Sequence, residues 1–217
     1  MTVKLISVTQ GAAELLGKSA QELIAYTARV SNPSNQMNTE TAPRLLAYLI
    51  KHKHWSPFEM AHVTLEITTS RAIAAQILRH RSFAFQEFSQ RYSKATDFVF
   101  YDARRQDAKN KQNSLDDLDE ETKRWFQDAQ FGVTGYCSSL YEKALEKGIA
   151  KEQARFLLPL NTQTTLYMCG SLRSWIHYCE VRCDVSTQKE HREIALAARK
   201  VLAEQFPDVA KAMEWET

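Results

Sequence analysis

The spacing of apolar and polar residues in the first third of the chain predicts two strands and three helices. Residues 3–8 alternate loosely between apolar and polar side chains, and residues 61–68 alternate strictly, so we expect both segments to be strands. Apolar residues three and four positions apart predict helices over residues 19–30, 41–53 and 71–81. This pattern favours a protein that packs helices against a sheet.

Two of these helices carry recognisable start signals. Ser19 is the expected N-cap of the first helix, and Glu22 stands three residues later, where its carboxylate completes a capping box. Pro43 falls in the first turn of the second helix, where a missing N–H costs nothing. The third helix, residues 71–81, leads into a loop, so the side chains at its end can converge on a ligand.

Helical spacing returns after a polar segment in the middle of the chain. Residues 102–121 contain neither Val nor Ile and predict an exposed excursion. A long helix is expected over residues 121–147, with Gly148 as its C-cap. A short helix from Lys151 is expected to end at the interruption Leu158-Pro159-Leu160.

Two more helices are expected after residue 164. Residues 165–181 predict one helix and residues 188–206 another. Thr187 and Glu190 have the spacing of a capping box at the start of the last helix, and Pro207 is expected to close it.

Length and composition fit one domain over residues 1–217. The chain has 44% hydrophobic and 25% charged residues, which is ordinary for a globular protein. The opening segment MTVKLISVTQ lacks the features of a secretory signal and no apolar run is long enough for a membrane span, so we expect a cytoplasmic protein without a membrane partner. Its four cysteines form no CxxC pair, which predicts reduced thiols and no metal; a zinc site is the alternative.

The positive charge of the chain is concentrated in one short segment. Formal net charge is +2, yet residues 71–94 carry five Lys or Arg side chains and a single acid, Glu87. Within this segment the run Arg79-His80-Arg81 is followed by Ser89 and Arg91. Guanidinium groups bind phosphate and carboxylate with two parallel hydrogen bonds, so the cluster predicts a site for an oriented anionic ligand such as a nucleotide. Solvated or ion-paired arginines at a helix end are the alternative.

Three further arginines stand out in the second half. Arg155 precedes an apolar run, while Arg173 and Arg182 are nine residues apart in one predicted helix. Nine residues are about two and a half turns, so these two side chains are expected to serve different parts of a ligand or different chains. A structural contact between Arg182 and Asp184, or with the helix end, is the alternative.

Several motifs resemble those of one enzyme family. The run RHRSFAFQEFSQRY is similar to the RHR-x7-S signature of the flavin-dependent thymidylate synthases. ARVSNP at 28–33, HKHWSPFE at 52–59, ARFLLPLN at 154–161 and the helix that ends at Arg182 resemble that family in order and spacing. The resemblance runs from about residue 3 to residue 206.

The resemblance implies a fold, a reaction and an assembly. It implies an α/β, or α+β-like, protomer with a mixed sheet flanked by long helices, and a homotetramer whose active sites are shared between chains. The implied reaction is the reductive methylation of dUMP to dTMP. Methylenetetrahydrofolate would donate the carbon, and FAD reduced by NADPH would donate the hydride, so that tetrahydrofolate is released. Nucleic acid is not an expected partner.

The resemblance also assigns residues to ligands. Arg182 would be the catalytic residue, because a guanidinium beside N3 and O2 of uracil stabilises the ionised pyrimidine. The implied dUMP contacts are Gln76, Arg79, Glu87, Ser89, Gln90, Arg91, Arg155 and Arg182. The implied FAD contacts are Ser56, Arg79, His80, Arg81, Glu87, Ser171, Arg173 and His177, with His54 and Glu59 as neighbours of the flavin or folate.

Some positions depart from the common family pattern or lie outside it. Ala84, Gln86, Ser171 and His177 are such departures, and they leave the detailed flavin contacts open. His62 and His191 lie outside the matched segments and are expected to be surface or packing residues. Ser89 has no adjacent base in the sequence and is interpreted as a phosphate contact rather than a nucleophile.

Two other functions stay open at this point. A non-catalytic nucleotide- or RNA-binding protein could use the loop from Arg79 to Arg91, although the nearly neutral net charge counts against it. A flavin enzyme that acts on a different pyrimidine has the same residue types.

Overall fold

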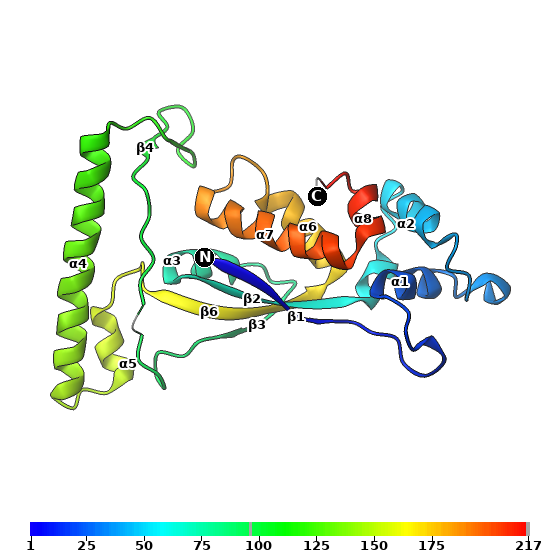
Figure 1. The fold of residues 1–217 in the computed structure, drawn as a ribbon, viewed down its shortest axis with the longest axis horizontal. Helices are drawn as coiled ribbons and strands as arrows, with labels where there is room; N and C mark the ends of the chain where they lie inside the picture. The colour runs from blue at the N-terminus through cyan, green and yellow to red at the C-terminus, as the bar shows by residue number, and fades with distance from the viewer. Residues whose placement is uncertain (96, 216–217) are drawn as a thin grey trace.

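A four-stranded antiparallel sheet forms the centre of the protein (Figure 1). The computed structural model describes residues 1–95 and 97–215. In spatial order the strands are β1 (Thr2–Val8), β2 (His62–Ser70), β6 (Gln163–Ser171) and β3 (Ala84–Glu87), and each neighbouring pair is antiparallel. The expectation of a mixed sheet was therefore wrong, and the α+β description is the better one.

Eight α-helices accompany this sheet in the described part of the chain. They are α1 (Ala20–Ala28), α2 (Ala42–Lys51), α3 (Arg71–Ile77), α4 (Glu120–Glu146), α5 (Lys151–Ala154), α6 (Leu172–Arg182), α7 (Lys189–Gln205) and α8 (Pro207–Ala212). Short 3-10 turns are η1 (Ala13–Leu15), η2 (Pro33–Asn35), η3 (Ser56–Met60) and η4 (Arg155–Leu157). None of the helices among these residues combines the length and the apolar content needed to cross a membrane.

Most predicted boundaries in the first half are confirmed. The side chain of Ser19 accepts a hydrogen bond from the backbone of Glu22, and Glu22 returns one, so the predicted capping box caps α1. Pro43 stands in the first turn of α2. Helix α3 is shorter than expected, since it ends at Ile77 and leaves Arg79 in the following turn.

The core lies between the sheet and the helices on one of its faces. Figure 1 shows α3, α6 and α7 on the same side of the sheet. The side chains of Val63, Leu65 and Ile67 on β2 are fully buried there, and the intervening residues are not, so the predicted alternation of this strand is confirmed. Trp175 of α6 is fully buried on this face and donates to the backbone oxygen of Val63 at 3.1 Å.

The helix predicted over residues 165–181 was wrong in its first half. Residues Gln163–Ser171 form the strand β6, which pairs with both β2 and β3, and helix α6 begins only at Leu172. Thr164, Leu166 and Met168 are buried while the residues between them are more exposed, which is the period of a strand. Pairing on both sides decides the conformation of this segment.

Strand β2 with helix α3 and strand β6 with helix α6 form two similar units. The two strands have nine residues each and pair along their whole length, from His62 opposite Ser171 to Ser70 opposite Gln163. Ser70 and Ser171 each cap the helix that follows. Because the strands are antiparallel, the two helices start at opposite ends of the sheet and their C-terminal ends meet.

The start of α7 differs from its prediction. Gln188 is the N-cap and makes no side-chain capping bond, so the predicted capping box of Thr187 and Glu190 is absent. The carboxylate of Glu190 instead accepts two hydrogen bonds from Arg104 of the polar excursion. Pro207 does not simply end the helical segment, since it opens the further helix α8.

The polar excursion and helices α4 and α5 form an arm at one end of the sheet (Figure 1). The excursion, residues 102–121, folds into a short hairpin of β4 (Arg105–Gln106) and β5 (Ser114–Leu115). Helix α4 confirms the long predicted helix, and Gly148 follows its end with φ +78°. The arm has a small core of its own, made by Tyr141, Ala144 and Ala154.

Candidate functional site

The ends of helices α3 and α6 meet at a hydrogen bond between two predicted site residues. The Nε of Arg182 donates to Nε2 of His80 at 2.9 Å. A nitrogen that accepts is unprotonated, so the imidazole of His80 is neutral. Burial, assisted by the charges of Arg182 and His177, lowers the pKa of His80 to about 4. The alternative contact of Arg182 with Asp184 is not made, because Asp184 accepts from the backbone and hydroxyl of Ser186.

Two residues that the sequence did not assign to the site complete this centre. The ring of Tyr178 packs edge-on against His80 with centroids 4.9 Å apart, and its hydroxyl lies 3.1 Å from Nε2 of His191. His191 is fully buried, so the expectation of a packing residue holds, but Nδ1 of its ring also lies 3.3 Å from Oε1 of Gln76. Burial, followed by the charge of Arg182, lowers the pKa of His191 to about 3.

The periodicity of α7 contains the signal that locates His191. Its buried stripe includes Ile194, Ala195, Ala198 and Leu202, and His191 is three residues before the first of them. A polar side chain at a position of the apolar stripe must find partners inside the protein.

A groove of about 470 Å³ lies beside the start of α6. Several predicted flavin contacts surround it, and its lining residues are Trp55, Glu59, Ser82, Arg173, Ser174, Ile176, His177 and Glu180. Arg173 donates to Oε1 of Glu59 at 2.9 Å, and the hydroxyl of Ser171 donates to the other carboxylate oxygen. The bond from Ser171, then that from Arg173, holds the pKa of Glu59 below its usual value although burial opposes this.

The remaining predicted flavin residues lie near this groove in the chain. Ser56 is the exposed first residue of η3, two residues before the buried Phe58. His54 is exposed and packs edge-on against Tyr48, with ring centroids 6.0 Å apart. Arg79 and Arg81 are exposed on either side of His80.

A second group of predicted residues lies toward the arm. Glu87, at the end of β3, accepts from Arg71 at 3.0 Å and from the hydroxyl of Thr164 at 2.9 Å. Ser89 follows and accepts from the backbone N–H of Arg91 at 3.4 Å, while Gln90 is buried.

Arg91 and Arg155 are brought together by one residue of α5. Nε of Arg91 lies 3.3 Å from the carboxylate of Glu152, and Nε of Arg155 donates to the backbone oxygen of Glu152 at 3.1 Å. The guanidinium of Arg155 also lies over the ring of Phe156, 5.7 Å from its centroid.

The single chain does not bring these two groups into one pocket. Ser171 and Arg173 lie at the C-terminal end of β6, whereas Arg91 and Arg155 lie beyond its N-terminal end. A nine-residue antiparallel strand spans roughly 27 Å, so these two groups lie about one strand length apart. The described residues contain no group of three His, Cys, Asp or Glu side chains that could hold a metal ion.

The chain matches a known family over most of its length. The model of the family described as "Thymidylate synthase complementing protein" matches residues 13–208. The chain therefore belongs to this family.

Similar proteins carry a more specific name. The flavin-dependent thymidylate synthase of Synechocystis sp. (strain ATCC 27184 / PCC 6803 / Kazusa) is 61% identical over 217 residues, which cover 99% of this chain and 100% of that protein. The probable flavin-dependent thymidylate synthase of Paramecium bursaria Chlorella virus 1 is 55% identical over 216 residues, with 99% and 100% covered. The chain is an enzyme of the flavin-dependent thymidylate synthase family.

A solved structure shares the fold. The UMP/dUMP methylase PolB from Streptomyces cacaoi, bound with 5-Br dUMP, superposes with a TM-score of 0.83 at 23% identity and covers 98% of this chain and 94% of that chain. At this identity the likeness concerns the fold.

Proposed function

We propose that the protein carries out the reductive methylation of dUMP to dTMP, with methylenetetrahydrofolate as carbon donor and FAD, reduced by NADPH, as hydride donor. Membership of the family and the flavin-dependent relatives support this reaction. The observation that carries it is the contact between Arg182 and a neutral His80.

This contact orients Arg182 for a pyrimidine. The histidine takes the Nε–H of the guanidinium, which leaves the two terminal amino groups as a planar fork of donors. Such a fork fits the O2 and ionised N3 of a uracil ring. A charge-assisted contact that strengthens as the ring becomes anionic contributes on the order of 3 kcal/mol to the transition state.

The residues around the groove fit a flavin dinucleotide. Trp55, Ile176 and His177 offer apolar and aromatic surface for a ring system, while Arg173 offers a guanidinium for a pyrophosphate. The bound flavin would supply the hydride transfer that no side chain can provide. Glu59 and Ser171 would keep Arg173 in place at the rim.

The phosphate of dUMP is proposed to bind the arginines of the second group. Arg91 and Arg155 converge on Glu152, and Ser89 lies next to Arg91 in the chain. Glu87, Gln90, Gln76 and Arg79 complete the proposed nucleotide contacts. Because Arg91 and Arg155 lie roughly one strand length away from the flavin-side residues Ser171 and Arg173 within one chain, each active site would combine residues of several copies.

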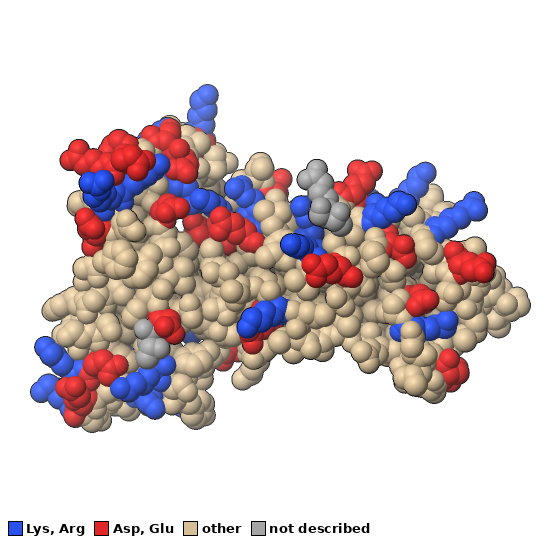
Figure 2. Space-filling view, viewed as in Figure 1, with Lys and Arg blue, Asp and Glu red and all other residues tan. Residues whose placement is uncertain are grey.

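Exposed apolar residues on α4 support a homotetramer. Trp125, Val133 and Tyr136 are 67%, 56% and 67% exposed, and their spacing places them on one side of the helix. Figure 2 shows the middle of α4 without charged residues, between charged ends. Gly132 and Gly135 lie in this stretch, and a Cβ at either would meet nothing within 4 Å. Glycine weakens a helix, but without a Cβ it lets another backbone come close. Two glycines on this open face therefore support the close approach of a second copy.

We further propose that residues 1–217 act as one domain in the cytoplasm. The small core of the arm is continuous in sequence with the strand β6, which belongs to the main core. All four cysteines are free thiols, as a reducing compartment allows.

The test is spectroscopic and then chemical. The purified protein should show an oxidised flavin band that NADPH bleaches without oxygen, faster when dUMP is present, and dTMP should form once methylenetetrahydrofolate is added. A protein that takes up no FAD, and that instead binds polynucleotide with a steep salt dependence, would overturn the proposal.

A further inference from the structure

The amide of Gln76 is held from two sides by residues at the start of α7. Its Nε2 donates to Oε1 of Gln188 at 2.7 Å, and its Oε1 lies 3.3 Å from Nδ1 of His191. A side-chain amide has an NH2 donor on one side and an oxygen acceptor on the other, and a flip of the group exchanges them. Partners that fix both sides therefore decide whether a ligand meets the donor or the acceptor.

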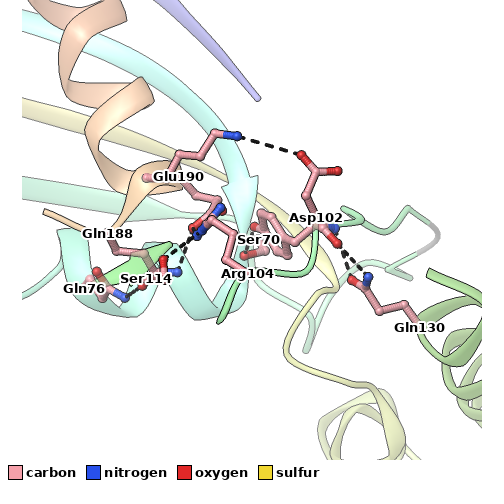
Figure 3. A network of polar contacts seen from close by, with 10 residues as sticks. Ser70, Gln76, Asp102, Arg104, Ser114, Gln130, Gln188 and Glu190 are labelled. Carbon is pink, nitrogen blue, oxygen red and sulfur yellow. Dashed lines mark hydrogen bonds and ion pairs between the residues drawn. The ribbon is translucent and has the colours of Figure 1, made fainter. Parts of the chain in front are cut away.

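The contacts of Gln188 continue to a buried ion pair (Figure 3). Nε2 of Gln188 donates to Oε2 of Glu190 at 2.9 Å. Arg104, from the polar excursion, donates to both carboxylate oxygens of Glu190 at 2.6 and 3.0 Å. The side chains of Arg104 and Glu190 are only 12% and 6% exposed, so water does not replace these contacts.

The carboxylate of Glu190 gives this chain of hydrogen bonds one direction. Burial raises the pKa of Glu190, but the bonds from Arg104 and Gln188 outweigh it, so the pKa lies below its usual value and the group is an acceptor only. Gln188 must then donate to Glu190 and accept from Gln76. The oxygen of Gln76 is thereby turned toward His191, which donates through Nδ1 while Nε2 accepts from Tyr178.

We propose that Arg104 and Glu190 are positioning residues for the nucleotide site, and that they fix the orientation of the Gln76 amide through Gln188. The inference rests on the proposed function, in which Gln76 contacts dUMP. A reversed amide would exchange the donor and the acceptor that Gln76 presents to the bound nucleotide, which weakens binding without removing any side chain from the site.

The polar excursion thus acts on the nucleotide site although it supplies no nucleotide contact. Nε of Arg104 donates to the hydroxyl of Ser114 at 2.8 Å, so the ion pair is anchored to β5. The neighbouring Arg105 provides a matched control. It pairs with Asp117 at 2.5 Å in the same hairpin, but these side chains are 47% and 48% exposed and have no link to Gln76.

The experiment compares FAD-loaded protein with and without single substitutions. Glu190→Gln keeps the shape of the side chain but can donate, so it allows the chain of amides to reverse. Gln188→Ala removes the link, and because Gln188 is exposed it leaves the buried ion pair intact. The dissociation constant for dUMP is measured by equilibrium dialysis, the KM for dUMP and kcat by dTMP formation, and the melting temperature by circular dichroism.

Both variants are expected to weaken dUMP binding by roughly three- to tenfold and to raise KM by a similar factor, with FAD content unchanged. Arg105→Gln should stay within about twofold of the parent. Wild-type dUMP affinity in Gln188→Ala and Glu190→Gln would overturn the proposal, as would a lower melting temperature in Glu190→Gln with unchanged binding. If the parent protein itself fails to bind dUMP, the proposed function fails instead.

Discussion

Arg182 is the last residue of α6 and His80 lies three residues after the end of α3, and a hydrogen bond of 2.9 Å joins their side chains. The bond requires a neutral imidazole, so the state of one residue depends on the other. The same pair joins the two strand–helix units at the point where the substrate base is proposed to bind.

Replacing Arg182 with Gln should lower dTMP formation about a hundredfold, because the fork that stabilises the anionic pyrimidine is lost. The pKa of His80 should rise in this variant, since the nearby positive charge contributes to its lowering. Turnover assays and NMR titration of His80 measure the two effects. Arg192→Gln removes the same charge from α7, where the guanidinium binds the backbone of Val185, and should leave turnover unchanged. Full activity of Arg182→Gln would show that Arg182 does not stabilise the anionic pyrimidine.

The buried histidines should make stability depend on pH. The pKa of His191 is lowered to about 3 and that of His80 to about 4, against 6.5 as the ordinary value. The unfolded chain therefore binds protons first, so the stabilisation is complete above about pH 6.5 and is lost as the pH falls toward 4.

His191→Gln keeps a polar side chain that does not titrate and should reduce this loss by about 1 kcal/mol between pH 6.5 and 5.5. Urea unfolding at both pH values measures it. The exposed His62, changed to Gln, is the control. An equal change in the free energy of unfolding with pH for His191→Gln and the parent would show that the burial of His191 does not govern the pH dependence of stability.

Glu59→Gln should weaken FAD binding about tenfold. The carboxylate holds Arg173 and Ser171 at the rim of the groove, and an uncharged amide holds a guanidinium less strongly. Fluorescence titration with FAD gives the affinity. Glu66→Gln removes a carboxylate of β2 that pairs with Lys4, and FAD should bind this variant like the parent. An unchanged affinity in Glu59→Gln would separate this cluster from flavin binding.

Gly132→Leu should disrupt the proposed tetramer, because a large side chain on α4 would keep a second copy at a distance. Gly132→Ala separates side-chain bulk from helix propensity. Alanine adds little bulk to this face, and it favours an isolated helix by about 1 kcal/mol. Light scattering reports the mass of each variant. Gly148→Leu, at a φ of +78° outside the helix, is a control that strains the chain without placing bulk on this face. A Gly132→Leu protein of unchanged mass would exclude this face as the interface.

The sequence predicted those structural features that depend on residues close together in the chain. The Ser19 capping box, the alternation around Leu65 and Gly148 after α4 each depend on neighbours in the chain, and each is confirmed. The strand β6 was missed because its conformation is decided by β2 and β3, which lie far away in the sequence.

For the candidate site, the sequence predicted individual residues but not the contacts between them. Motifs indicated Arg182 and His80, but their spacing could not show that the two would touch. Glu190 was assigned to a capping box because its offset from Thr187 is right, whereas Arg104, 86 residues away, binds it in the structure. Long-range polar partners leave no periodic trace in a sequence.

The meeting of α3 and α6 has an electrostatic consequence. Each helix carries a partial negative charge of about half an elementary unit at its C-terminal end. Arg182 is the last residue of α6, and it binds His80, which lies three residues after the end of α3. The partner of this half-buried guanidinium is an imidazole, so its charge is balanced by peptide dipoles rather than by a carboxylate. An arriving anion therefore displaces no carboxylate of the described residues from the guanidinium of Arg182.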